Sequence, residues 1–211
     1  MIEPRPTHGT DFRRIEAFSD GVIAIAITLL VLTFLDVDIA SKTSGELQEV
    51  LLDLGPQLWA YALSFAVIGR FWLVHHRVLD VLARFDGVLV ALNMVFLASV
   101  VLIPFTSDLL GTEGDLAPAT QAYAVSVAMA ALASLAMLRY ALRRGLVARE
   151  HLARVRDSFG TRSAGIAVVF LVSVPIAIWS TLAAQLVWLI GFLVRPGRFI
   201  RWRGGEPSSG A

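Results

Sequence analysis

The sequence predicts an all-α integral membrane protein with six transmembrane helices. Hydrophobic residues make up 56% of the 211 residues and the mean hydropathy is +0.70, whereas soluble domains are about 45–50% apolar. Six stretches are apolar over roughly the 20 residues that a membrane helix needs. They cover approximately 13–35, 56–80, 85–110, 117–142, 163–180 and 183–200. The absence of cysteine excludes disulfides, thiol catalysis and cysteine-bound metals.

The first span begins among charged residues. Its apolar run, Gly21 to Leu35, would form a helix of about 22 Å, too short for a hydrocarbon core of about 30 Å. The helix must therefore start near Arg13, which places Ser19 and Asp20 in its first turns. An ionisable group there is costly and is normally retained for a partner or a function. A cleaved signal peptide is disfavoured, because acidic residues are out of place in one.

Prolines shape two of the later spans. Pro104 is expected to kink the outer end of the third span, and Pro175 the fifth. Residues 163–200 are too long for one spanning helix, so we expect a tight hairpin there. The predicted channel domain covers 13–203, between flexible tails at 1–12 and 204–211.

Arginines mark one side of the membrane. They precede the first span, separate the second from the third and the fourth from the fifth, and follow the sixth, while acidic residues dominate the other connections. The positive-inside rule then predicts a multi-pass cell-membrane protein with both termini cytoplasmic. The basic stretch 139–162 is interpreted as lying near anionic headgroups rather than binding nucleic acid. Its apolar residues are spaced so that they could contact lipid: Leu142, Leu146, Leu152, Val155 and Phe159.

The first span carries a recognisable motif. Arg14-x-x-x-Phe18-Ser19-Asp20, followed by Ala24-Ile25 and Thr28-Leu29-Leu30, resembles the signature of the transmembrane-protein-175 family of potassium channels, in its prokaryotic single-repeat form. The motif occurs once per chain, and a pore on a symmetry axis needs several copies, so we expect a homo-oligomer. The resemblance implies a homotetramer with the first helix around a central pore, no cofactor and no enzymatic activity.

Ile25, Leu29 and Leu32 share one narrow helical face, with Thr28 at its edge. The pattern alone favours helix packing or lipid contact. The resemblance instead implies that these four residues line the pore as a hydrophobic constriction. It implies transient potassium passage at Ile25, Thr28 and Leu29, without a tight metal site.

Polar residues on three spans are predicted to brace the pore helix. Asp20 lies about 140° from Ile25 on the helix, toward neighbouring helices. Trp72 and His75 share a face of the second span, and Asn93 lies in an apolar run of the third. We expect a hydrogen-bonded cluster of Ser19, Asp20, Trp72, His75 and Asn93; the alternative is separate interfacial residues. The bracing set also includes Arg14 and Phe18, which fall on the side of Ile25.

The function predicted from these features is passive potassium conduction, with potassium ions, lipid and further copies of the chain as partners. A proton-conducting channel is the nearest alternative, because a dry aliphatic constriction can treat protons and metal ions differently. A secondary transporter usually shows inverted repeats and broken helices, which are not evident. An intramembrane enzyme is also disfavoured, because His75, Asp20 and Asn93 match no catalytic spacing.

Overall fold

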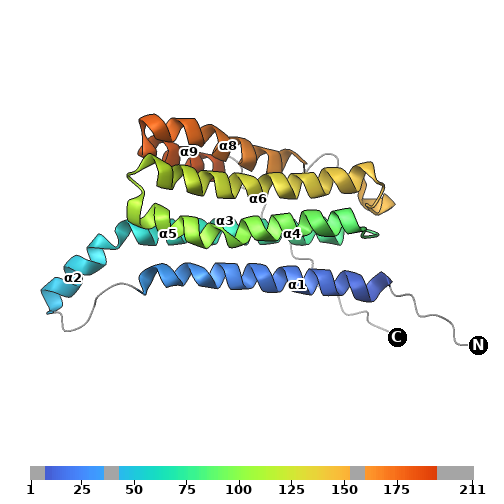
Figure 1. Cartoon of the computed structure of the whole chain (residues 1–211), viewed down its shortest axis with the longest axis horizontal. Coiled ribbons are helices and arrows are strands. Elements are labelled where there is room, and N and C mark those ends of the chain that lie inside the picture. The colour runs from blue at the N-terminus through green and yellow to red at the C-terminus, as the bar shows by residue number, and fades with distance from the viewer. Residues whose placement is uncertain (1–7, 36–42, 153–159, 194–211) are drawn as a thin grey trace, which may run out of the picture.

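The computed structural model describes residues 8–35, 43–152 and 160–193, and these are helical apart from short connections. Figure 1 shows long helices running side by side, with α2 projecting from one end. In chain order the elements are α1 (His8–Leu29), η1 (Leu30–Phe34), α2 (Ser44–Asp53), α3 (Gly55–Asp80), α4 (Gly87–Val101), α5 (Ile103–Glu113), α6 (Ala117–Arg143), η2 (Arg149–His151), α8 (Gly160–Trp179) and α9 (Thr181–Leu193).

The first four predicted spans are long and apolar enough to cross a membrane. They are Arg13–Phe34, Gly55–Asp80, Gly87–Glu113 and Ala117–Arg143. The apolar part of α8, Ala164–Trp179, is shorter, and α9 has 13 residues within the described part of the chain. The predicted sixth span, 183–200, runs beyond the described residues. The structure therefore supports four of the six predicted spans by length and composition.

Proline and serine positions explain two breaks between helices. Helix α4 ends at Val101 and α5 begins at Ile103, with Pro104 in the first turn of α5, where a missing N–H costs nothing. A single residue, Ser180, separates α8 from α9, and the two helices pack together as the expected hairpin. Pro175 lies inside α8 without ending it.

The structure contains helical residues at two places that the predicted spans left out. The N-terminal tail was expected to reach residue 12, but α1 begins at His8; residues 1–7 and 204–211 lie outside the described part. Helix α2 was missed, although Thr43 and Glu46 form a capping box, a recognised helix start. The Thr43 backbone N–H, which lies 2.7 Å from Glu46 Oε2, holds the pKa of Glu46 below its ordinary value.

Small residues form the core around α6. This helix packs against α4, α5 and α8 and lies between them in Figure 1. Its buried residues include alanines and serines such as Ala124, Ala128, Ala131 and Ser134. Small side chains allow helix backbones to approach closely, which drives association where lipid removes the usual hydrophobic advantage.

The basic end of the bundle is held by backbone pairing. The turn between α3 and α4 and the segment after α6 meet there: Ala83 N donates to Leu146 O (2.8 Å) and Ala148 N donates to Val81 O (2.9 Å). Leu146 is consequently buried, at 7% exposed, rather than facing lipid as expected. Val155 and Phe159 lie outside the described residues. Figure 1 places the N-terminal end of α1 at this same end, as the arginine distribution predicts.

Candidate functional site

One face of α1 packs against the rest of the chain. Ser19, Ile23 and Ala26 of α1, and Leu30 at the start of η1, are at most 2% exposed. Their spacing of four, three and four residues puts them on a single stripe. Helices α3, α4 and α5 contact α1. The rotation of α1 about its axis is therefore fixed by this buried stripe.

The opposite face of α1 is exposed and apolar. Ile25 is 62% exposed, Leu32 48% and Leu29 36%. Thr28 is exposed as well, and its hydroxyl donates to Ile25 O at 2.8 Å. The hydroxyl proton of Thr28 is used in this hydrogen bond. The Thr28 oxygen therefore keeps lone pairs that can accept a further hydrogen bond or coordinate a cation. Leu32 lies in η1, directly after α1. We call Ile25, Thr28, Leu29 and Leu32 the α1 stripe.

Two consecutive residues attach α1 to two different helices. Trp72 Nε1 of α3 donates to Asp20 Oδ1 at 2.9 Å. Asn93 Nδ2 of α4 donates to Ser19 Oγ at 3.0 Å, and Ser19 Oγ donates to Ile15 O at 2.9 Å. Ser19 and Asn93 are completely buried. The two interhelical hydrogen bonds start from positions about 100° apart around the axis of α1. Together they restrict the rotation of α1 about its axis and its translation along that axis.

His75 takes part in neither of these two interhelical hydrogen bonds. Its ring stacks on Phe96, with centroids 4.6 Å apart and planes 13° from parallel. His75 Nε2 and Asn93 Oδ1 are buried and lack a hydrogen-bond partner among the described residues. Trp72 and His75 are three residues apart, yet Trp72 is 40% exposed beside α1 whereas His75 is 1% exposed. Sharing a helical face was therefore insufficient to place both in one cluster.

Arg14 and Phe18 differ from the other expected bracing residues. Both are exposed, and Phe18, at 52% exposed, lies on the side of α1 that carries Ile25. Both side chains are thus on the exposed side of α1 in the part of the chain that the structure describes. Any bracing by these two side chains would have to act between copies of the chain.

A second polar group, missed in the sequence, lies between α1 and α3. His76 Nδ1 is 3.6 Å from Glu16 Oε1, and His76 Nε2 is 3.7 Å from Asp80 Oδ2. The His76 ring also stacks on Trp72, with centroids 6.0 Å apart. One ligand atom from each of Glu16, His76 and Asp80 lies within 4.8 Å of the others. The spacing of His76 and Asp80 by four residues was the available signal, but the contribution of Glu16 required the packing of α1.

Comparisons with known proteins agree with this geometry. The family model described as "Endosomal/lysosomal potassium channel TMEM175" matches residues 14–104, which contain both interhelical bonds of α1. A protein from Streptomyces collinus named as a potassium channel is 40% identical over 123 residues, covering 57% of this chain and 58% of that protein. A chicken (Gallus gallus) protein named "Endosomal/lysosomal proton channel TMEM175" is 36% identical over 102 residues, 46% of this chain and 20% of that protein.

The similarity in structure extends further along the chain. The crystal structure of a "lysosomal potassium-selective channel TMEM175 homolog" from Chamaesiphon minutus has a TM-score of 0.75 at 28% identity. That match covers 88% of this chain and 98% of the other. In sequence, the matches span 58% and 48% of the bacterial relatives from Streptomyces collinus and Chamaesiphon minutus. Residues 14–104 thus resemble the TMEM175 family, and the chain shares the fold of a bacterial TMEM175 homolog, with four helices long and apolar enough to span a membrane.

Proposed function

We propose that this chain forms a homotetrameric channel that conducts potassium through a central pore lined by the α1 stripe. The observation that carries the proposal is the two-sided character of α1: one face is buried on α3, α4 and α5, and the opposite face exposes Ile25, Leu29 and Leu32. A single exposed stripe cannot enclose a pore, whereas symmetry-related copies can. The names of the bacterial relatives support potassium as the ion.

The proposed constriction acts by exclusion. Rings of Ile25, Leu29 and Leu32 offer a passing ion no oxygen ligands, and the Thr28 hydroxyl oxygen is the polar atom of the stripe. An ion must therefore lose or deform its hydration shell with little replacement coordination, so conduction depends on side-chain size. In this arrangement, the basic end of the bundle and both termini are cytoplasmic in the cell membrane.

Liposome flux measurements test this mechanism. Ile25→Ala and Leu29→Ala should raise ion flux and reduce the preference for potassium over sodium, because each substitution widens the constriction. Val31→Ala is the matched control: Val31 is also apolar and 52% exposed, but it lies in η1 and is not one of the four residues of the α1 stripe. If both stripe variants behave like Val31→Ala at equal protein density, the pore is lined elsewhere.

The role proposed for Asp20 is to hold α1 in place. Asp20→Ala removes the acceptor of the Trp72 Nε1 hydrogen bond and should lower the yield of assembled oligomer more than it changes selectivity. Size-exclusion chromatography in mild detergent measures the first effect and liposome flux the second. Normal assembly with altered selectivity would place Asp20 in the pore instead.

Proton conduction is the second candidate, favoured by the animal relatives named as proton channels. A pH-sensitive dye inside the same liposomes separates the two functions. Potassium conduction predicts that a potassium gradient drives potassium flux while buffer keeps the pH equal on both sides. A proton channel predicts that a pH gradient acidifies the liposome interior whichever metal cation is present.

A further inference from the structure

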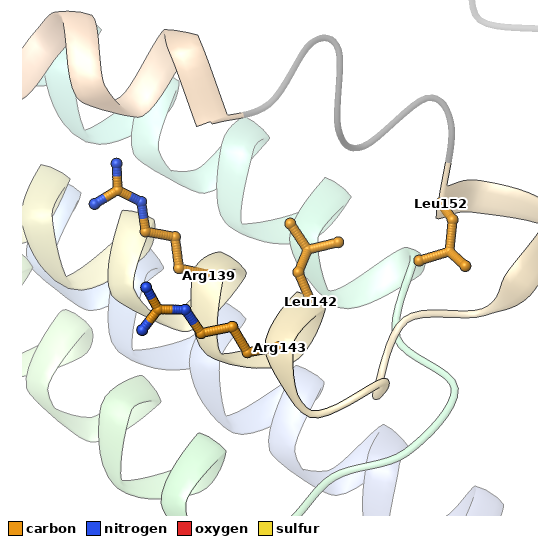
Figure 2. Close-up of a pocket in the computed structure, with 4 residues that line it drawn as sticks. All are labelled: Arg139, Leu142, Arg143 and Leu152. Carbon is orange, nitrogen blue, oxygen red and sulfur yellow. The ribbon is translucent and has the colours of Figure 1, made fainter.

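A cavity of about 500 Å³ opens beside the C-terminal end of α6 and is lined by Arg139, Leu142, Arg143 and Leu152. Its size falls within the roughly 300–1,000 Å³ range of small-molecule sites. Figure 2 shows the two arginine side chains extending in the same direction from α6, with Leu142 beside them and Leu152 farther away on the segment that follows. Charged and apolar groups thus line one cavity.

The two arginines place two positive charges next to each other. Arg139 and Arg143 are four residues apart and share a helical face; both are exposed, and neither has an acidic partner among the described residues. Arg144, the next residue, differs because it interacts with the carboxylate of Asp86. Like charges at this spacing repel each other, and an anion between them would relieve the repulsion. Guanidinium groups are also well suited to bidentate contact with phosphate oxygens.

The position of Arg139 and Arg143 along the membrane helix favours the phosphate of a lipid headgroup over a free phosphate ion. Arg139 and Arg143 lie in the last two turns of the candidate span Ala117–Arg143, which is the level of lipid headgroups in a membrane. Leu142 and Leu152 provide apolar surface for the start of an acyl chain. Basic pockets at the ends of membrane helices are suited to anionic lipid headgroups.

We propose that the cavity lined by Arg139, Leu142, Arg143 and Leu152 binds the phosphate of an anionic phospholipid. Both guanidinium groups contact the phosphate oxygens, and the acyl chains extend along the leucines into the bilayer. This site is separate from the α1 stripe, and its occupancy does not depend on the ion that the protein conducts.

Native mass spectrometry of the purified protein in mild detergent tests the proposal, with dioctanoyl phosphatidylglycerol as the probe. Dioctanoyl phosphatidylcholine tests the need for net negative charge, and inorganic phosphate tests the need for a lipid. The wild-type protein should bind phosphatidylglycerol at least about tenfold more tightly than phosphatidylcholine. Inorganic phosphate at millimolar concentration should not displace the lipid.

The variants separate a site from general surface charge. Arg139→Gln combined with Arg143→Gln should abolish the preference for phosphatidylglycerol, and paired Arg→Lys substitutions should keep part of it. The control is Arg84→Gln with Arg149→Gln, which removes two exposed charges at the same end but outside the cavity. Its preference should remain within about twofold of wild type. An equal loss in both double variants, no loss in either, or displacement by inorganic phosphate would overturn the proposal.

Discussion

The substitution Ser19→Ala should lower the free energy of unfolding when residue 93 is asparagine, and should have almost no effect when Asn93 has been replaced. Both side chains are completely buried, and Asn93 Oδ1 already lacks a partner among the described residues. Ser19→Ala removes the acceptor of Asn93 Nδ2 and leaves the whole amide without a hydrogen bond. Hydrogen bonds between membrane helices contribute on average about 0.6 and at most about 1.7 kcal/mol. Because the remaining amide is fully unpaired, we expect a loss near the upper value, about 1.5 kcal/mol.

A double-mutant cycle isolates that energy. Asn93→Leu removes the amide at similar volume, and Ser19 can still donate to Ile15 O, so this change should cost less than about 1 kcal/mol. In the Asn93→Leu background, Ser19→Ala should then be almost neutral, which gives a coupling of about 1–1.5 kcal/mol. For a chain of this length, that coupling corresponds to about 3–5 °C in Tm.

Thermal unfolding in mild detergent measures each corner of the cycle. Ser99→Ala is the control: this buried serine also lies on α4, but its hydroxyl donates only to Val95 O of the same helix. It should therefore change Tm by less than about 2 °C. An identical cost of Ser19→Ala in both backgrounds would refute the argument, because it would show that the two side chains are not energetically coupled.

Two further predictions concern the scaffold. Gly111→Ala should lower Tm by several degrees, because the new Cβ would lie 3.0 Å from Gln57 Cα, whereas Gly69→Ala, with nothing within 4 Å, should be neutral or slightly stabilising; equal effects would contradict the close α3–α5 contact. At the start of α4, the backbone N–H of Leu89, and next the Tyr140 hydroxyl, hold the pKa of Asp86 below its ordinary value. This stabilisation is present above the unfolded pKa of about 3.9 and is lost as pH falls through the folded pKa. The Tm difference between wild type and Asp86→Asn should therefore be present at pH 7 and shrink below about pH 4; a constant difference would contradict it.

The sequence was sufficient for features that depend on length and local chemistry. The first four spans follow from runs of apolar residues, and the break before Pro104 follows from its missing backbone N–H. The direction of Asp20 followed from helical geometry, and its contact with Trp72 agrees with that direction. In each case the prediction needed only one helix and its periodicity.

Features set by tertiary packing were less accessible. His75 was expected to join a hydrogen-bonded cluster with Ser19, Asp20, Trp72 and Asn93. Its ring instead stacks on Phe96 of α4, a contact that depends on how α3 and α4 cross. The burial of Leu146 depends on backbone pairing with the turn after α3, which helical periodicity cannot show. A buried cluster of hydrogen-bonded hydroxyls likewise joins α3, α5 and α6, although its members are far apart in the sequence. They are Ser64, Ser107 and Tyr123.

The way α1 is attached has a consequence for protein engineering. Among the described residues, α1 makes no backbone hydrogen bond to another helix; its polar contacts with α3 and α4 come from the side chains of Glu16, Ser19 and Asp20. The compatibility of α1 with its own chain is thus set by these three side chains and by the buried Ile23 and Ala26. The first helix can accordingly be treated as an exchangeable module. Chimaeras that transplant α1 from a relative should keep α1 packed on α3 and α4 when these five positions are retained, which leaves the exposed face free to be varied in tests of oligomer assembly.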